Sequence, residues 1–355
     1  TGFAQLSVAD TIDVNTRWTI TDSPVTVTDT LVIKKGVTLT VDPGVIVEMN
    51  NNVSFVINGG IIADGTNTDR IRFTSSEANP AAGDWNSVLM NSNDAVGSVI
   101  DHVIFEYGGS GNFGAMIRYR TGAFGFDLTN IIVRHSVGHG IDLRSTDLLI
   151  KHATITENNG YGIFSDLAFA FTVDSSTVRG NTVGGILVPR NSQPVIHAST
   201  IDSNAVGILI GDGATPAITE NTIQDNTTGI RAIQVGSVSP EIRDNNISGN
   251  TQFGVENVGS TTLIATFNFW GDRNGPVNLG NPTGNGDTVA GNVDFTPWLA
   301  NTTALPFFEQ TQDINGNVTW QADSIVVIKN DISVNNGATL TIEPGTIIKF
   351  ERFAR

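Results

Sequence analysis

The sequence contains no cysteine, and this absence excludes disulfide bonds and cysteine-ligated metal sites. No apolar run reaches the roughly 18 residues that a membrane-spanning helix needs, so no membrane span is expected. Sustained helical spacing of apolar residues is also missing, which predicts very little α-helix. Basic residues number 19 against 35 acidic ones, and the net charge of −16 opposes binding to nucleic acid, anionic lipid and polyanionic glycans.

The absence of cysteine also gives an indication of where in the cell the protein is found. A chain of 355 residues without cysteine fits a secreted bacterial protein whose stability comes from stacked strands rather than from disulfides. No signal peptide is visible at Thr1, which indicates a mature chain or a fragment. We therefore expect an extracellular protein at the bacterial cell surface.

The chain does contain a short sequence motif that recurs six times between residues 133 and 255. Each copy has a β-branched residue, an Asn or Ser three positions later, and a closing Gly followed by an aliphatic residue. The β-branched residues, spaced by 22, 23, 23, 22 and 24 positions, are Val133, Ile155, Val178, Ile201, Ile223 and Ile247. The polar residues are Ser136, Asn158, Asn181, Asn204, Asn226 and Asn250, and the glycines are Gly140, Gly162, Gly185, Gly207, Gly229 and Gly254. A period this regular indicates a solenoid.

Each repeat divides into three short strands bounded by Gly, Asn, Asp or Pro. Three strands in about 22 residues predict an all-β parallel β-helix, in which equivalent strands stack about 4.8 Å apart. The β-branched residues should then face the interior. The Asn residues should form a buried ladder that satisfies backbone groups of the turns. The glycines are expected at turn positions with positive φ.

A second repeat operates on a larger scale. Residues 31–49 and 332–350 match at an offset of 301 residues, and Trp18 recurs as Trp320. These matches predict an N-terminal cap or leader over residues 1–30, a β-helix module over residues 31–299, and the opening of a second copy over residues 300–355. The last part is a candidate for head-to-tail self-assembly. The residues assigned to that contact are Trp320, Leu340, Ile342, Ile347 and Phe350.

The end of the module carries a distinctive motif. Residues 268–271 read Asn-Phe-Trp-Gly and residues 297–299 read Pro-Trp-Leu. With Leu-Thr-Val-Asp-Pro-Gly at 39–44 and Gly-Asp-Trp at 83–85, these motifs resemble bacterial secreted proteins with right-handed parallel β-helix repeats. The resemblance covers about residues 31–299 and implies a right-handed fold. That family includes surface adhesins, cell-wall proteins and glycan-active enzymes, so it implies no single function. Trp270 and Trp298 are expected to cover the last rung.

Catalytic candidates are sparse. Pectate lyases and polygalacturonases share this fold and use clustered carboxylates. The Asp residues of this sequence do not recur at one position of the repeat, so they are not expected to cluster on neighbouring rungs. The densest polar patch holds His135, His139, Asp142 and Arg144, and Asp101 is a further carboxylate candidate. One interpretation of the patch is a small glycan or metal site. The other, which we favour, is a solvated outer face with an Asp–Arg pair.

Acidic loops provide the remaining candidates for a cofactor. Asp212, Asp272 and Asp287 could hold Ca²⁺, although an ordinary Asx turn fits their sequences better. No other cofactor is expected. Sugar-stacking platforms, if the protein binds surface glycans, would be Trp85, Tyr107 or Tyr119.

The leading hypothesis for function is a non-enzymatic structural protein of the cell surface: a stalk, sheath, filament or adhesin module. It rests on the repeated module, the acidic charge and the lack of a recognisable catalytic constellation. The runner-up is a secreted polysaccharide lyase or glycoside hydrolase, and a third hypothesis is a passive carbohydrate-binding β-helix. Sugar release lost on Asp142→Ala or Asp101→Ala would favour the enzyme, and binding without turnover would favour the third hypothesis.

Overall fold

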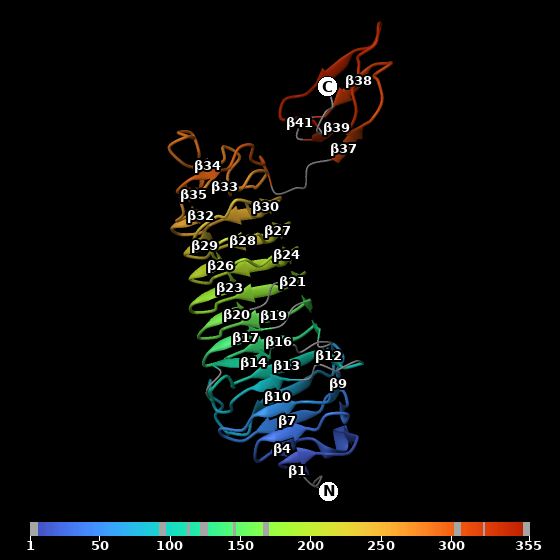
Figure 1. Ribbon diagram of the computed structural model, residues 1–355, viewed down its shortest axis with the longest axis vertical. Coiled ribbons are helices and arrows are strands. Elements are labelled where there is room, and N and C mark those ends of the chain that lie inside the picture. Colours follow the sequence, from blue (N-terminus) through green and yellow to red (C-terminus); the bar gives the residue numbers. More distant parts are fainter. Residues whose placement is uncertain are drawn as a thin grey trace. The chain divides into compact units, whose positions relative to one another are not determined.

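The computed structural model describes residues 6–91, 97–111, 114–120, 127–144, 147–165, 170–301, 307–321 and 324–350. The chain divides into two compact units, residues 1–299 and residues 300–355. The first unit stacks short parallel strands into three long sheets, which we call sheets A, B and C (Figure 1). This arrangement confirms the prediction of an all-β parallel β-helix with three strands per rung.

The strands follow one another around the three sheets in a fixed rotation. Sheet A has 11 strands, in the order β1 (Leu6–Val8), β4 (Val25–Val27), β7 (Ile46–Met49), β10 (Ile71–Ser75), β13 (Val103–Glu106), β16 (Ile132–Arg134), β19 (Thr154–Thr156), β22 (Thr177–Arg179), β25 (Thr200–Asp202), β28 (Thr222–Gln224) and β31 (Asn246–Ser248). Sheet B has 13 strands, in the order β2 (Thr11–Ile12), β5 (Leu31–Ile33), β8 (Phe55–Ile57), β11 (Val88–Met90), β14 (Ala115–Tyr119), β17 (His139–Leu143), β20 (Tyr161–Ser165), β23 (Gly184–Val188), β26 (Val206–Ile210), β29 (Thr228–Ala232), β32 (Phe253–Asn257), β35 (Gly286–Ala290) and β34 (Pro276–Val277). Sheet C has 10 strands, in the order β3 (Thr16–Trp18), β6 (Thr38–Val41), β9 (Gly60–Asp64), β12 (Val99–Asp101), β15 (Leu128–Thr129), β18 (Leu148–Lys151), β21 (Phe171–Asp174), β24 (Val195–His197), β27 (Ala217–Thr219) and β30 (Glu241–Arg243).

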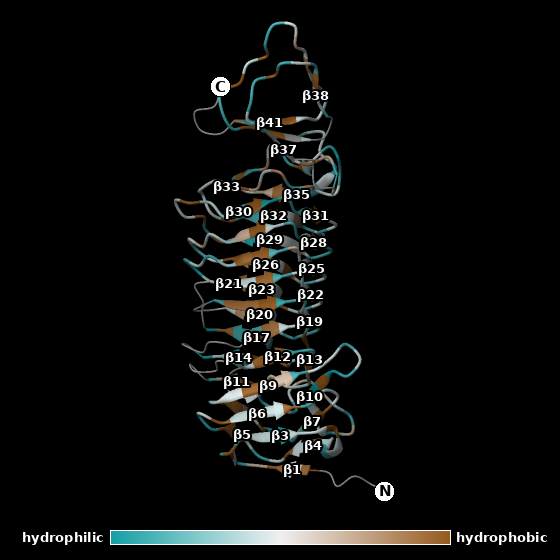
Figure 2. Ribbon diagram, turned by 90° about the vertical axis from the view of Figure 1, so that its right-hand side faces the viewer, coloured by the Kyte–Doolittle hydropathy of each residue, from teal (hydrophilic) through white to brown (hydrophobic). Residues whose placement is uncertain are grey.

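The core runs along the axis between the sheets. Because side chains alternate across a strand, the short strands send alternate, mostly apolar residues inward and the others outward. The six β-branched residues of the repeat are direct register partners in sheet A, and all are fully buried. Apolar strands therefore lie above one another from rung to rung (Figure 2). Each rung buries its apolar side against its neighbours, as expected for a solenoid.

The closing glycines are needed for a different reason from the one that the sequence suggested. The prediction of positive φ at these six glycines is wrong, because positive φ occurs elsewhere in each rung. A Cβ atom on Gly185 would lie 2.5 Å from the carbonyl oxygen of Gly207 and 3.1 Å from Nδ2 of Asn204. Glycine is therefore required by close packing between rungs. In the turns between sheets C and A, the left-handed residues are His102, Asn130, His152, Ser175, Ala198, Glu220 and Asp244.

Two ladders of polar side chains run through the turns. In the first, Asn158, Asn181, Asn204 and Asn226 each donate from the backbone N–H and from Nδ2 to Oδ1 of the next Asn in the series, at 2.9–3.2 Å. Asn250 is the last Asn of the series and donates to Oδ2 of Asp287. The second ladder, which the sequence analysis missed, consists of Ser176, Ser199, Asn221, Asn245 and Asn268. Both ladders supply acceptors to buried backbone N–H groups at the corners.

The two ends of the first unit are closed in different ways. Residues 6–27, expected in a separate cap, form the first strands of all three sheets, and Leu6 and Ile12 pack against the core. At the other end, β33 (Leu263–Ile264) pairs with β36 (Val293–Asp294), Trp270 is fully buried, and Trp298 packs against the core. Among the described residues, the only helical element is the 3₁₀ helix η1 (Ile20–Asp22), and no helix is long and apolar enough to cross a membrane.

The second unit reproduces the strand pairing of the first rungs. Its strands are β37 (Phe307–Gln310), β38 (Val318–Trp320), β39 (Ile325–Ile328), β40 (Leu340–Ile342) and β41 (Ile347–Phe350). Trp320 pairs with Ile342 as Trp18 pairs with Val41. The core of this unit contains Ile314, Trp320, Val326 and Ile328. Of the residues assigned to self-assembly, Leu340 and Ile347 are half-buried, whereas Ile342 and Phe350 are exposed.

Candidate functional site

A cluster of polar and aromatic side chains lies on the outer face of sheet B. Its residues come from three neighbouring strands, β14, β17 and β20, and follow the strand register. Arg118 pairs with Asp142, and Asp142 pairs with Phe164. The residues on either side of each are buried, so alternation turns these three side chains outward. The rung period therefore brings together residues that are 22 to 24 positions apart in sequence.

Asp142 is the anchor of the charged half of this cluster. Its Oδ2 lies 3.2 Å from Nε of Arg144 and 3.5 Å from Nε of Arg118, and the residue is only 2% exposed. Burial lowers the pKa of Arg118, and the charge of Asp142 partly opposes this shift. A carboxylate held between two guanidinium groups orients both of them, and removal of one partner would leave a buried charge poorly compensated.

His139 forms the aromatic half of the cluster together with Phe164 and Tyr161. Its ring stacks on that of Phe164 with 4.3 Å between centroids and 7° between planes. The backbone N–H of Tyr161 donates to Nδ1 of His139 at 3.0 Å. Burial lowers the pKa of His139, which keeps the imidazole neutral at neutral pH. With Nδ1 acting as the acceptor, the proton of the neutral ring is on Nε2, so the ring presents a fixed donor.

Two of the sequence candidates lie outside this cluster. His135 is in the turn after sheet A, where its ring stacks on Tyr107 with 5.1 Å between centroids and its Nδ1 lies 3.5 Å from Glu157. Asp101 is on sheet C, where its Oδ1 accepts a hydrogen bond from Asn130 and contacts His102 at 3.1 Å. The structure thus gathers His139, Asp142 and Arg144, and it adds Arg118 and Phe164, which the sequence analysis did not name.

The prediction that Trp85 and Tyr119 stack on sugars is wrong, because both side chains are buried. Trp85 is fully buried, and its indole N–H donates to the backbone carbonyl of Glu106. Tyr119 is also fully buried, and burial raises the pKa of its phenol well above the usual value. Of the three aromatic residues named from the sequence, only Tyr107 keeps a partly exposed ring. Tyr119 is a core residue because it pairs with the buried Met90 on the inward side of sheet B, and Trp85 belongs to the same hydrophobic core.

The three loop aspartates expected as weak calcium ligands lie apart and have other partners. Oδ2 of Asp212 is 3.6 Å from Arg190. Oδ1 of Asp272 accepts the backbone N–H of Asn274, as in an Asx turn. Asp287 ends the first Asn ladder. Across the described ranges, no group of three or more His, Cys, Asp or Glu side chains is placed to hold a metal ion.

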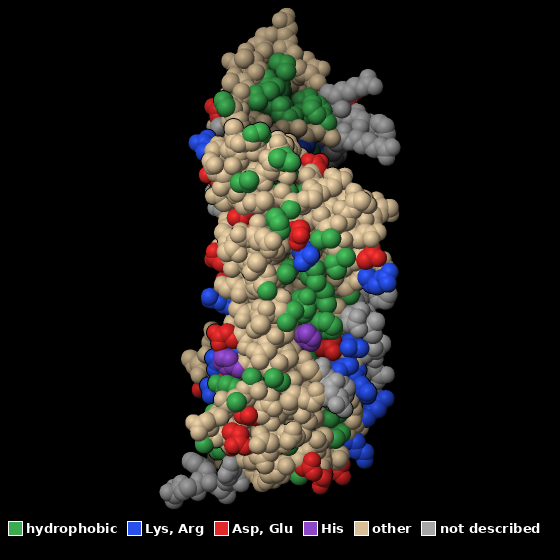
Figure 3. All heavy atoms as spheres, turned by 90° about the vertical axis from the view of Figure 1, so that its left-hand side faces the viewer, with side chains coloured by type: hydrophobic (Ala, Val, Ile, Leu, Met, Phe, Trp, Pro, Cys, Tyr) green, Lys and Arg blue, Asp and Glu red, His purple; other side chains and the backbone are tan. Residues whose placement is uncertain are grey.

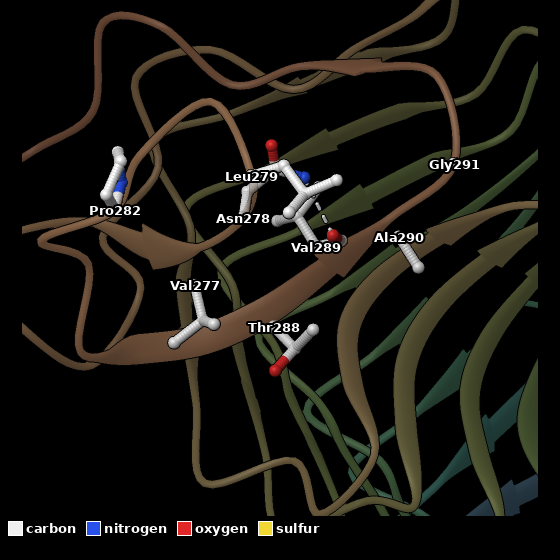
Figure 4. Close-up of a pocket in the computed structure, with 8 residues that line it drawn as sticks. All are labelled: Val277, Asn278, Leu279, Pro282, Thr288, Val289, Ala290 and Gly291. Atoms are coloured by element: carbon white, nitrogen blue, oxygen red, sulfur yellow. Dashed lines mark hydrogen bonds between the residues drawn. The ribbon is translucent and has the colours of Figure 1, made fainter.

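A cavity of about 710 Å³ lies near the last strands of sheet B (Figure 4). Its lining includes Val277, Leu279, Pro282 and Val289, and Nδ2 of Asn278 donates to the carbonyl oxygen of Val289. The lining residues carry no formal charge, and Leu279 is fully exposed. This cavity lies on the last strands of the stack, away from the charged and aromatic cluster of β14, β17 and β20.

Comparison with family models agrees with the fold. A family model described as the right-handed β-helix region matches residues 117–269. No curated protein matches the chain. Among solved structures, a periplasmic alginate epimerase is 14% identical with a TM-score of 0.34, over 92% of this chain and 76% of that one. An alginate lyase from a Paenibacillus species is 12% identical with a TM-score of 0.34, over 74% and 93% of the two chains. The A-module of an Azotobacter vinelandii mannuronan C-5 epimerase is 12% identical with a TM-score of 0.36, over 98% and 89%.

Proposed function

Because the chain is a right-handed parallel β-helix repeat protein, we propose that it is an extracellular, non-enzymatic protein that binds a glycan on the outer face of sheet B. The observation that carries this proposal is the stacked pair of His139 and Phe164 beside the Arg118–Asp142–Arg144 group. The proposal combines two of the hypotheses drawn from the sequence, a non-enzymatic surface module and a carbohydrate-binding β-helix.

The chemistry of a sugar fits this cluster. A pyranose ring has apolar C–H faces and a rim of hydroxyl groups, so it is bound well by an aromatic platform with hydrogen-bond donors beside it. Phe164 and Tyr161 supply aromatic surface, and both are partly exposed. Nε2 of His139 and the guanidinium groups of Arg118 and Arg144 supply donors in fixed positions.

The same geometry favours binding over turnover. A general base needs a lone pair within reach of the substrate proton. Nδ1 of His139 already accepts the Tyr161 amide, and the Asp142 carboxylate is buried between two arginines. Glycoside hydrolysis requires two carboxyl groups about 5–10 Å apart across one sugar bond. The two carboxylates named for the enzyme hypothesis, Asp101 and Asp142, are on different sheets. The cluster thus offers donors and stacking surface.

A panel of soluble polysaccharides tests the proposal. We expect binding without release of sugar, and we expect Phe164→Ala and His139→Gln each to weaken it at least about tenfold, the effect of losing roughly 1.4 kcal/mol of contact. His135→Asn is a matched control, because His135 also stacks on an aromatic ring but lies in the turn after sheet A. Products released from any polysaccharide would instead establish an enzyme, and absence of binding across the panel would overturn the proposal.

A second candidate function follows from the second unit, whose strands repeat the register of the first rungs. We propose that successive copies form a surface scaffold by head-to-tail contact. Light scattering and electron microscopy would compare the full chain with a variant lacking residues 313–355. Ordered polymers formed by the full chain alone would support the scaffold. Monodisperse full chain, or polymers that persist after the deletion, would contradict it.

A further inference from the structure

An apolar strip continues from the cluster along sheet B. One outward side chain from each of seven neighbouring strands forms a single column: Arg118, Asp142, Phe164, Leu187, Leu209, Arg231 and Glu256. The middle three, Phe164, Leu187 and Leu209, are half-buried, and Tyr161 and Val206 flank them on β20 and β26. We call these five residues the sheet B strip. Figure 3 shows hydrophobic side chains gathered along this face.

Charged pairs border the strip at both ends. The Arg118–Asp142 pair lies at one end, and at the other Nε of Arg231 is 3.1 Å from Glu256. Arg120 is exposed two residues after Arg118, on the same side of the chain by strand alternation. In Figure 3, Lys and Arg side chains gather beside the lower end of the strip, although the whole chain is acidic. The local charge at the border therefore differs from the net charge of −16.

From this arrangement we propose that the sheet B strip binds a linear, carboxylate-bearing polysaccharide lying parallel to the helix axis, with one sugar unit per rung. This inference rests on the proposed glycan-binding function. The strands repeat about every 4.8 Å along the axis, which is close to the length of one pyranose unit in an extended chain. Each rung thus offers one contact to each successive sugar.

The arginines at the two ends of the sheet B strip favour an acidic polysaccharide over a neutral one. A guanidinium has five N–H donors in a planar fork, so an arginine that already contacts one carboxylate can bind another through its remaining edge. Such charge-assisted bonds to carboxylates are about twice as strong as neutral ones. Arg118 and Arg120 at one end and Arg231 at the other are spaced to meet acid groups on separate sugars, while the apolar middle packs against C–H faces.

Calorimetry with two series of oligosaccharides, two to eight units long, tests this proposal on the full chain. The probes are oligogalacturonates, which carry one carboxylate per unit, and neutral cello-oligosaccharides of equal length. We expect the affinity for the acidic series to rise up to about six units, one for each rung from β14 to β29, and then to level. We expect acidic chains to bind at least about tenfold more tightly than neutral ones, and added salt to reduce that preference.

Variants locate the ligand on the strip. Leu187→Asp places a negative charge in the apolar middle, and Arg231→Gln removes the distant arginine without adding bulk. Each should weaken binding of a hexagalacturonate at least about tenfold but leave a digalacturonate less affected. Val195→Asp is the matched control, because Val195 is an exposed aliphatic residue on a strand of sheet C. Circular dichroism would verify that all three variants are folded.

The outcomes separate this inference from the proposed function. Equal affinity for short and long chains, or equal affinity for acidic and neutral chains, would overturn the inference while leaving glycan binding at the cluster intact. An equal effect of Val195→Asp would also overturn the assignment to sheet B. Failure of every oligosaccharide and polysaccharide to bind would overturn both.

Discussion

Replacement of Asn181 by alanine removes one member of the first Asn ladder without changing the backbone. Oδ1 of Asn181 accepts the backbone N–H of Asn158 at 3.2 Å and its Nδ2 at 2.9 Å. That Nδ2 also donates to the carbonyl oxygen of Val133 at 3.4 Å, a weaker contact. The substitution therefore deprives two buried donors of Asn158 of their best acceptor.

The magnitude follows from those two donors. A buried donor that loses its acceptor costs about 1–3 kcal/mol, so we expect the free energy of unfolding to fall by about 3 kcal/mol. Thr182→Ala is the control, because Thr182 is the exposed neighbour of Asn181, and its substitution should change stability by less than about 0.5 kcal/mol. Urea denaturation followed by circular dichroism measures both variants, provided that the slope with denaturant is unchanged.

Because each rung contacts only its neighbours, the loss should also be local. Native-state hydrogen exchange should show faster exchange at the Asn158 amide and at its rung, but little change in the first rungs of the stack. A loss of stability below about 1 kcal/mol, with the Asn158 amide still protected, would refute the argument that the ladder satisfies the corner amides.

Two further predictions concern packing and pH. Burial raises the pKa of Asp287, so its neutral form is favoured in the folded state, and the contribution of Asp287 to wild-type stability should decline as pH rises above the usual carboxyl pKa. Asp287→Asn keeps an acceptor for Asn250 without the charge. In urea titrations, the stability of this variant relative to wild type should rise as the pH increases above the usual carboxyl pKa, and a difference independent of pH would contradict this. Gly185→Ala places a Cβ atom 2.5 Å from the Gly207 carbonyl oxygen and should cost about 1–3 kcal/mol. Gly316→Ala, which meets open space, is the control, and an equal effect in thermal melts would show that rung packing is not the cause.

The sequence predicted the fold well because the spacing of the buried apolar residues equals the number of residues in one rung. Val133, Ile155 and the later members of that series are separated by one rung each, and the structure makes them register partners. The glycines were located but misinterpreted. Whether a glycine is needed for positive φ or for close packing depends on which atoms of the next rung lie against it. One copy of the sequence motif does not show those contacts.

The candidate site was predicted only in part. His139, Asp142 and Arg144 were found because they are close in sequence. Phe164 and Arg118 were missed because they join the cluster through the rung period, 22 residues after and 24 residues before Asp142. The same phase argument would have placed Tyr119 inside, since it lies two residues from the buried Ile117 on one strand. Such sites are better found by looking for outward-facing residues that are spaced one rung apart in sequence than by looking for polar residues that are close together in sequence.

The direction of the Asn ladders has an electrostatic consequence. In both ladders the donor belongs to the earlier residue and the acceptor to the later one, so the amide dipoles point the same way along the axis. Aligned dipoles add, as in an α-helix, and their positive end attracts negative charge. In the first ladder that end meets the carboxylate of Asp287. The β-helix thus contains a row of side-chain dipoles with one polarity along the rungs from Asn158 to Asn250, and an acidic residue completes it at the positive end.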